Sequence, residues 1–245
     1  MEIREYRIMY ELEENHFWYK GMRKITRAIF EKYLPKKKQL KILDAGCGTG
    51  RNILFLKNFG KVSGIDISSN AIEYCKKREL ANIKLGSIDE ISFKDESFDL
   101  ITCFDVLYHK RVKNYIKAIG EFYRILKPGG TLFIRVPAYQ FLFSNHDVAV
   151  HAKHRFYQTE LKNILKKQHF KILKLTYVNS LLFFPIVIER ILKKLINHHD
   201  NTSDVKDINP FINFFLQIPL NLESILIKYF DFPFGLSLIA MVKKG

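Results

Sequence analysis

From residue 40 onward, short apolar runs alternate with stretches that carry apolar residues at helical spacing. The apolar runs predict seven strands, at residues 41–46, 61–66, 82–87, 97–107, 128–137, 171–178 and 237–244. The stretches at helical spacing predict helices at residues 51–60, 70–80, 114–126 and 159–170. Strands that alternate with helices favour a mainly parallel sheet covered on both faces. We therefore expect an α/β fold with an open, doubly wound, seven-stranded sheet.

Two regions lie outside this alternation. Residues 1–38 predict an N-terminal helical cap with the aromatic cluster HFWY at residues 16–19. Residues 179–235 are rich in Phe, Leu and Ile and predict a helical insertion before the last strand. The predicted organisation is therefore a cap (1–38), a binding domain (39–178 and 236–245) and the insertion (179–235).

The insertion contains one amphipathic stretch and one uncharged stretch. The apolar face of the amphipathic stretch is opposite Arg190, Lys193 and Lys194 and is made of Ile188, Ile191, Leu192, Leu195 and Ile196. The uncharged stretch, INPFINFFLQIPLNL, is interrupted by Pro210, Pro219 and three asparagines. Neither reaches the roughly 20 apolar residues that span a bilayer. Two interpretations stay open: a layer that caps the acceptor pocket, or an interfacial helix in contact with an anionic membrane.

Net charge separates the two parts of the chain. Residues 1–178 carry 33 Lys and Arg against 19 Asp and Glu, whereas residues 179–245 carry 7 against 6. The excess is typical of an anionic partner, such as nucleic acid, an anionic membrane or a phosphorylated substrate, or of a solvated lysine surface. The three cysteines show no paired spacing, and MEIREYRIMYELEE has no signal-peptide pattern. We expect a reduced, cytoplasmic setting.

The stretch KILDAGCGTGRN, residues 41–52, is the clearest chemical signal. A strand that ends in a glycine turn and opens a helix binds nucleotide-like ligands, because glycines allow close approach and the helix offers free N–H groups. Dinucleotide sites usually read G-x-G-x-x-G. Here an acid leads and the glycines alternate strictly, at Asp44, Gly46, Gly48 and Gly50.

This spacing is followed by GIDIS at 64–68, SFDLITCFDVLYH at 97–109 and RILKPGGTLFIRVP at 124–137. The four ordered motifs resemble those of class I S-adenosylmethionine-dependent methyltransferases. The resemblance implies a Rossmann-like fold, S-adenosyl-L-methionine as cofactor and S-adenosyl-L-homocysteine as product.

The resemblance also implies which residues hold the cofactor. The backbone at Gly46, Cys47 and Gly48 would lie against the methionine and ribose portions. Asp44 would orient the loop and meet the amino group, and Asp66 would accept hydrogen bonds from both ribose hydroxyls.

The adenine end of the implied site departs from the family at one position. Ile67 would pack on the adenine, with Phe104 lining the same pocket. Many relatives end the third strand in Gly-Asp, whereas this chain reads Gly-Ser-Ile-Asp from residue 86. The adenine contact would therefore fall to Ser87 or to the backbone of Ile88.

The segment ENHFWYKGMRK, residues 14–24, resembles the lead-in of a subgroup related to the ubiquinone-pathway O-methyltransferases. There an aromatic helix covers the cofactor and an arginine pairs with the methionine carboxylate. Arg23 is the candidate for that pairing, since a guanidinium can bind a carboxylate bidentately. The alternative is that the aromatics pack on the sheet and Arg23 is solvated.

Methyl transfer to a hydroxyl needs a positioned acceptor and benefits from a general base. His109, shortly after the fourth strand, is the first candidate, or it fixes a loop by hydrogen bonds. Ubiquinone-type relatives carry a Glu-x-x-Glu-His metal cluster there. This chain has Asp105 and Tyr108 in place of the two acids, which argues against a metal.

A second group of candidates follows the fifth strand, in the segment NHDVAVHAKHRFY. It holds His146, Asp147, His151, His154 and Arg155. A His–Asp pair could act as a base while Arg155 holds an anionic group. A purely structural loop and a metal site remain alternatives, although the spacing fits no zinc pattern.

No residue of the sequence identifies the acceptor. The Asn/Asp-Pro-Pro-Tyr/Phe signature of amino-methyltransferases is absent after the fourth strand, which disfavours nucleic-acid bases as acceptors. The lead-in, the histidine loop and the ending PFGLS at 233–237 resemble methyltransferases associated with polysaccharide and lipid-linked glycan pathways. We expect O-methylation of a small molecule, sugar or lipid-linked glycan. The alternatives are an RNA or protein methyltransferase that uses the basic surface, and a non-catalytic cofactor-binding partner subunit.

Overall fold

The computed structural model describes residues 2–36, 39–195 and 207–245, with the side chains of 193–195 left out. The strands are β1 (Leu40–Ala45), β2 (Gly60–Asp66), β3 (Ile83–Leu85), β4 (Phe98–Phe104), β5 (Leu126–Pro137), β6 (Phe170–Val178) and β7 (Ser237–Lys244). The α-helices are α1 (Ile3–Leu12), α2 (Phe17–Tyr33), α3 (Arg51–Leu56), α4 (Ser69–Lys77), α5 (Tyr115–Ile125), α6 (Asn145–Ala149), α7 (Gln158–Lys167), α8 (Phe183–Leu195) and α9 (Pro210–Leu226). All seven predicted strands are present.

The seven strands form one sheet in the order β3-β2-β1-β4-β5-β7-β6. Strands β1 to β5 pair in parallel, and β7 runs antiparallel between β5 and β6. The predicted doubly wound, mostly parallel α/β sheet is therefore confirmed. Strand order reverses between β1 and β4, the position at which open α/β sheets bind ligands beyond the carboxyl ends of their strands.

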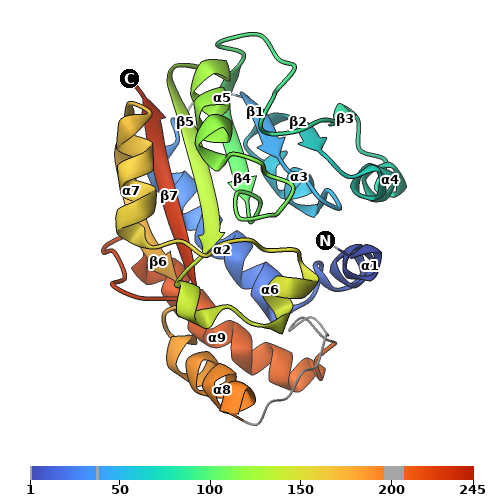
Figure 1. Cartoon of the computed structure of the whole chain (residues 1–245), viewed down its shortest axis with the longest axis vertical. Helices are drawn as coiled ribbons and strands as arrows, with labels where there is room; N and C mark the ends of the chain where they lie inside the picture. Colours follow the sequence, from blue (N-terminus) through green and yellow to red (C-terminus); the bar gives the residue numbers. More distant parts are fainter. Residues whose placement is uncertain (1, 37–38, 196–206) are drawn as a thin grey trace.

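Helices cover both faces of the sheet, with α5 and α7 in front and α2 behind in the view of Figure 1. The fully buried ring of Phe30 on α2 packs edge-on against Phe133 of β5, with 5.1 Å between ring centroids, and also contacts Phe55 of α3. Phe122 of α5 is fully buried as well. Such aromatic burial supplies much of the favourable energy that holds helices to a sheet.

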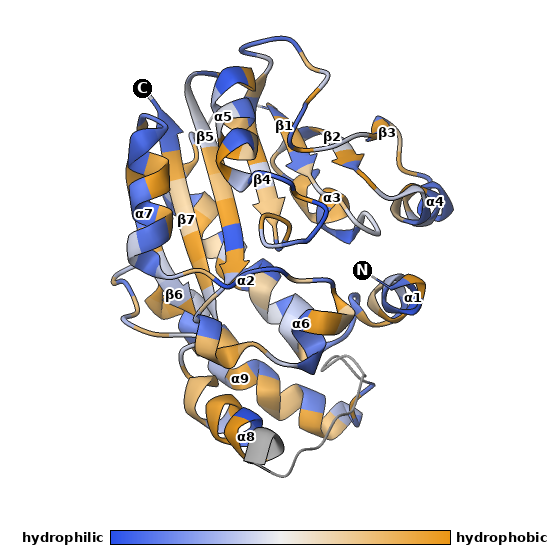
Figure 2. Cartoon of the chain, viewed as in Figure 1, coloured by the Kyte–Doolittle hydropathy of each residue, from blue (hydrophilic) through white to orange (hydrophobic). Residues whose placement is uncertain are grey.

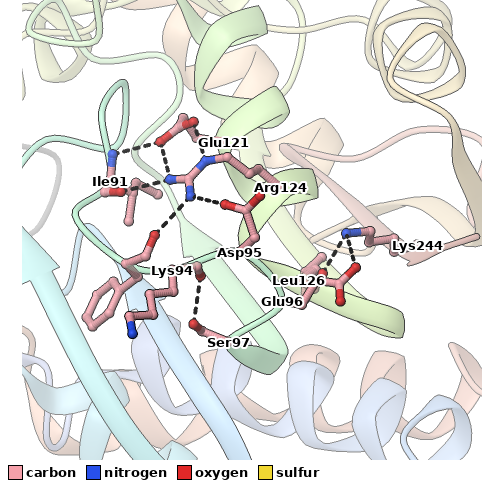
Figure 3. A network of polar contacts seen from close by, with 10 residues as sticks. Ile91, Lys94, Asp95, Glu96, Ser97, Glu121, Arg124, Leu126 and Lys244 are labelled. Carbon is pink, nitrogen blue, oxygen red and sulfur yellow. Dashed lines mark hydrogen bonds and ion pairs between the residues drawn. The ribbon is translucent and has the colours of Figure 1, made fainter.

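A polar network ties the loop before β4 to α5 at the edge of the sheet where β4 begins (Figure 3). The Arg124 guanidinium donates to Glu121 Oε1 and Oε2 at 2.8 Å, to the Ile91 carbonyl at 2.8 Å and to Asp95 Oδ1 at 2.6 Å. Nearby, Lys244 Nζ donates to the Leu126 carbonyl. These contacts fix the end of the sheet that is remote from the carboxyl ends of the strands.

The uncharged stretch of the insertion forms one continuous helix, α9, where the sequence predicted interruptions. Pro210 occupies the first turn, where a missing N–H costs nothing, and the Asn209 side chain caps the helix by accepting from the Phe211 N–H at 2.9 Å. Pro219 lies inside the helix. Burial of Leu220 against α2 offsets the backbone hydrogen bond that Pro219 removes.

None of the described helices is both long and apolar enough to cross a membrane. The amphipathic stretch also includes Lys193, Lys194, Leu195 and Ile196, whose predicted positions fall outside the described side chains.

Candidate active site

A cavity of about 1200 Å³ opens at the carboxyl ends of β1, β2 and β4. The glycine loop after β1 lines one end. Residues of the insertion, among them Leu182 and Leu216, line the other. α1 and α6 lie beside the carboxyl ends of the strands (Figure 1). One cavity therefore has room for a donor and an acceptor side by side.

The glycine loop needs its glycines. Gly46 and Gly48 have φ of +85° and +53°, in the left-handed region that L residues rarely adopt. A Cβ on Gly46 would lie 2.3 Å from Val106 Cγ2, whereas one on Gly48 would lie 3.3 Å from Met9 Cε. The loop thus offers bare backbone to the cavity, as the sequence predicts.

Asp66 ends β2 beneath this loop and is largely buried. Its Oδ2 accepts the Gly48 N–H and its Oδ1 accepts the Ser68 N–H, each at 2.9 Å. Burial raises the pKa of Asp66, and the two backbone donors oppose that rise. Each oxygen keeps a further lone pair, so the carboxylate can accept two hydroxyl donors from the cavity.

Asp44 is buried deeper and does not line the cavity. Its Oδ1 accepts the Thr102 hydroxyl at 2.8 Å, while its Oδ2 is buried with no hydrogen-bond partner in the described part of the chain. Burial raises the pKa of Asp44 to about 7. The side chain therefore supports the loop from below, and of the two predicted contacts with an amino group, direct or through water, the burial of Asp44 favours the one through water.

Apart from Arg23, the remaining predicted cofactor residues line the cavity. This set shares the glycine-loop end and consists of Cys47, Ile67, Ser87, Ile88 and Phe104. Ile67 is 46% exposed although it is a large apolar residue, which fits a side chain that is covered only when a ligand is bound.

α1 forms a lid over the glycine-loop end, with Tyr6 and Met9 facing the cavity. The buried carboxylate of Glu13, directly after α1, accepts from the Thr49 hydroxyl and from Arg78 Nη2. Arg78 also lies over the Tyr10 ring at 4.3 Å. These contacts join the lid to the glycine loop and to the end of α4.

Arg23 does not line this cavity, and its pairing with the methionine carboxylate stays a prediction. Its guanidinium donates to the Glu14 carbonyl and lines a separate depression between α2 and α3. The helix turns Met22 inward instead, where that side chain is 2% exposed. Arg51, at the start of α3, lines both the depression and the cavity.

The middle of the cavity contains an ion pair that the sequence did not single out. Arg135 projects from β5 and is 8% exposed, and its Nε lies 2.8 Å from Asp105 Oδ2. Asp105 follows β4 directly and has a φ of +57°, a strained conformation for an aspartate. The sequence signal that could have indicated this pair is the single arginine, Arg135, inside the apolar run LFIRVP.

His109 lines the cavity, but its geometry does not suit the base predicted for it. Burial lowers the pKa of His109 to about 4, so the ring is neutral near pH 7. Its Nδ1 accepts the Arg111 N–H at 3.0 Å, which places the ring proton on Nε2. In this tautomer the ring donates a hydrogen bond and fixes the 109–111 turn.

Of the alternatives for the histidine loop, the contacts of Asp147 favour a structural loop over a His–Asp base, because Asp147 pairs with Arg155. Arg155 Nε and Nη2 donate to the two Asp147 oxygens at 2.9 Å each, and both groups are buried. Asp147 further caps α6 through Ser144. Arg155 is thereby committed to Asp147 and to the Ala138 carbonyl, and does not hold an anionic substrate.

The two remaining histidine candidates, His146 and His151, differ in position relative to the cavity. His151 does not line the cavity, and its Nε2 lies 2.6 Å from Glu2 Oε1, so it ties the 149–152 turn to the N-terminus. His146 does line the cavity, on α6. Within the described residues, no three His, Cys, Asp or Glu side chains converge as a metal site would require.

The acceptor end of the cavity has a polar floor and an apolar wall. Tyr19 and Tyr108 belong to the floor, and burial raises the pKa of both phenols, so both are protonated near pH 7. The apolar wall comes from the insertion and consists of Leu182, Pro185, Ile186, Ile208 and Leu216. This end suits a ligand with one polar and one apolar part.

The glycine-loop end fits S-adenosylmethionine on two observations. Gly46 and Gly48 form a cradle that side chains would fill, and Asp44 has an unpaired buried oxygen behind it. Phosphate-neutralising clusters are not needed, because this ligand carries a sulfonium and an amino acid in place of a pyrophosphate.

Sequence comparisons relate the chain to methyltransferases. A family profile described as a methyltransferase domain matches residues 43–134. An uncharacterized protein of Methanocaldococcus jannaschii is 32% identical over 180 residues, which are 68% of this chain and 71% of that protein. A demethylmenaquinone methyltransferase of Staphylococcus aureus is 37% identical over 115 residues, which are 44% of this chain and only 47% of that enzyme.

Solved structures share the fold. A protein of Thermotoga maritima, described as a possible histamine N-methyltransferase, superposes with a TM-score of 0.62 at 20% identity, covering 99% of this chain and 96% of that one. Phosphoethanolamine N-methyltransferase 2 of Haemonchus contortus, solved with S-adenosyl-L-methionine, gives 0.56 at 20% identity and covers 90% of this chain and 52% of that one.

Fold, glycine loop and relatives define one class of protein. The chain belongs to the class I S-adenosylmethionine-dependent methyltransferases, and S-adenosyl-L-methionine is its cofactor.

Proposed function

We propose that the enzyme methylates a hydroxyl oxygen of an acceptor that carries an apolar tail, such as a lipid-linked sugar. The observation that supports this proposal is the composition of the acceptor end of the cavity. The lining combines polar groups, including the Asp105–Arg135 pair, with apolar residues of the insertion, which also contributes Glu189 and Arg190. A hydroxyl-bearing head would meet the polar groups, and a tail would lie along the insertion.

On the donor side, this chain's residues bind and orient. Asp66 would accept the ribose hydroxyls, and the backbone from Gly46 to Gly48 would lie against the methionine portion. S-adenosylmethionine, when bound, supplies an electrophilic methyl group on sulfur. Tyr6 and Met9 on the lid would exclude water from it, since both line the cavity over the glycine loop.

On the acceptor side, methylation of a hydroxyl releases its proton, and Asp105 is the residue placed to take it. Its two contacts with Arg135 both go to Oδ2, so Oδ1 can accept a hydrogen bond from the acceptor. Arg135 holds the carboxylate in a fixed orientation at the end of β4.

The test is methyl incorporation from S-adenosylmethionine labelled in the methyl group. The enzyme is incubated in parallel with a cellular lipid extract, a water-soluble metabolite extract, RNA and protein. We expect label in the organic-solvent phase, and a loss of about 10²-fold or more in Asp105→Asn. Label confined to the water-soluble, RNA or protein fraction would show that the acceptor has no apolar tail.

The matched control for Asp105→Asn is Asp95→Asn, which changes an aspartate of the network at the opposite edge of the sheet. Its rate should match that of the unmodified enzyme. If Asp105→Asn keeps the full rate, Asp105 does not take the proton.

A further inference from the structure

The two helices of the insertion turn apolar side chains toward solvent. Every exposed residue of α9 is apolar, and the set consists of Pro210, Phe211, Ile212, Phe214, Phe215, Ile218, Leu222 and Ile225. On α8 the exposed large apolar residues are Phe184, Ile188, Ile191 and Leu192. Both helices lie at one end of the molecule and are coloured largely apolar in Figure 2. On α9 these side chains recur every three or four residues along one face of the helix, and monomeric soluble proteins rarely expose a large apolar patch.

The polar groups of α9 are used internally. Its single acid, Glu223, is fully buried, and its carboxylate accepts the N–H groups of Asn179 and Ser180. Asn213 accepts from the Phe17 N–H, and Asn221 accepts from Lys24. Gln217 and Ser224 are half-buried and donate to backbone carbonyls of the helix itself, so the exposed face of α9 carries no charge.

A cationic depression lies beside this face, on α2 and α3. Its charged lining residues are Lys20, Arg23, Lys24, Arg27 and Arg51 against the single acid Glu14. Lys24 Nζ lies 2.7 Å from Asn221 Oδ1, which joins the depression directly to α9. In the part of the chain that the structure describes, only Arg51 of these five pairs with a carboxylate, that of Glu14.

We infer that the α8–α9 face docks on a bilayer surface that carries anionic lipids. The phenylalanine, isoleucine and leucine side chains enter the boundary between headgroups and acyl chains, and the cationic depression receives lipid phosphates. On α8 the face also carries the exposed Glu189, whereas the exposed residues of α9 are all apolar. An apolar helix face with a basic border is the pattern of interfacial helices. Protein interfaces, by contrast, carry roughly one hydrogen bond per 100–200 Å².

Docking in this orientation has a consequence for the cavity. The inner side of the insertion, with Leu182, Ile186 and Leu216, lines the acceptor end, while its outer side meets the lipid. An acceptor anchored in the same bilayer could reach the cavity without leaving the interface. Docking itself does not depend on the acceptor's identity.

The test is co-sedimentation of the whole chain with phosphatidylcholine vesicles, with and without phosphatidylglycerol, in the absence of donor and acceptor. We expect binding that needs phosphatidylglycerol and weakens with salt. Ile218→Glu should lower the partition coefficient by about tenfold or more, because it places a charge where an apolar side chain was buried in lipid. The matched control is Ile116→Glu on α5, since Ile116 is 46% exposed and Ile218 is 48% exposed.

The contribution of the cationic depression is tested separately. The double variant Lys20→Gln, Lys24→Gln should weaken binding to the anionic vesicles severalfold, and Lys162→Gln with Lys166→Gln on α7 should lower it less. Thermal melting of each variant confirms that it is folded.

Three outcomes would overturn docking. They are no binding to anionic vesicles by the unmodified chain, equal losses in Ile218→Glu and Ile116→Glu, or a stable dimer that Ile218→Glu converts to monomer. The last would assign the face to a second copy of the chain. None of these outcomes depends on methyl transfer, so failure of docking and failure of the proposed function are distinguishable.

Discussion

Two aspartates lie near the glycine loop, and their surroundings give them different properties. Asp66 accepts two backbone N–H groups and faces the cavity. Asp44 accepts a single hydroxyl and is buried with one oxygen unpaired. Only Asp66 is therefore placed to recognise a ligand directly, while Asp44 influences the loop through its protonation state.

The raised pKa of Asp44 predicts a pH-dependent stability. Its pKa is about 7 in the folded protein and near 3.8 for an ordinary aspartate. Between these values the folded protein binds a proton that the unfolded chain has lost, so the free energy of unfolding falls as pH rises. Asp44→Asn removes this contribution. Relative to the unmodified protein, the variant should gain about 2 kcal/mol between about pH 5 and about pH 7.

Urea unfolding of both proteins without cofactor, at a series of pH values, measures this difference. A stability difference that does not change over that range would show that Asp44 is ionised in the folded protein.

Single residues differ in how well sequence alone predicts their surroundings. Gly46, Gly48 and Asp66 are placed by a local pattern, a strand end followed by a turn, and the structure puts them together at the cavity. The partner of Asp147 is set by the fold of its loop, which brings Arg155 to it in place of a histidine. Arg23 faces the α2–α3 depression because of how α2 rotates on the sheet, which a helical pattern does not specify.

At the scale of elements, the contact between α2 and α9 depends on a glycine. An added Cβ on Gly21 would lie 2.4 Å from Leu220 Cδ1 and 2.7 Å from its Cβ, so the helices would have to move apart. Gly21→Ala should lower the free energy of unfolding by about 1–3 kcal/mol. Chemical denaturation followed by circular dichroism measures this loss.

Gly120 on α5 provides the control in the opposite direction. A Cβ there would meet its nearest neighbour, Gln168 Oε1, at 3.4 Å. Gly120→Ala should therefore raise the free energy of unfolding by about 0.5–1 kcal/mol, since alanine favours a helix. Equal effects of the two substitutions would show that α2 and α9 do not pack closely at Gly21.

The strands are easier to predict from the sequence than the helices of the insertion. A buried strand leaves an apolar run bounded by turn residues, and all seven such runs became strands. Continuity of α9 through Pro219 was not predicted, because the packing of Leu220 on α2 involves residues that are far apart in sequence. The antiparallel insertion of β7 between β5 and β6 is likewise a property of the whole sheet.

At the scale of the whole molecule, the cap and the insertion form one helical layer. α2 and α9 meet at Gly21 and Leu220, and Lys228 pairs with Glu31 further along. The sequence predicts these as separate segments, and its domain boundaries stay predictions. Their association lets a single layer line the cavity inside while the outer face of α9 remains apolar.

The central claim is that this cavity binds the methyl donor through Asp66 and the glycine loop. Calorimetric titration with S-adenosyl-L-homocysteine tests it most directly. We expect one site per chain, with affinity reduced by about tenfold or more in Asp66→Asn and in Asp66→Ala, because hydrogen bonds to a charged group are lost. Asp95→Asn, at the other edge of the sheet, should bind as the unmodified protein does. Unchanged affinity in Asp66→Ala would contradict the assignment of the donor site.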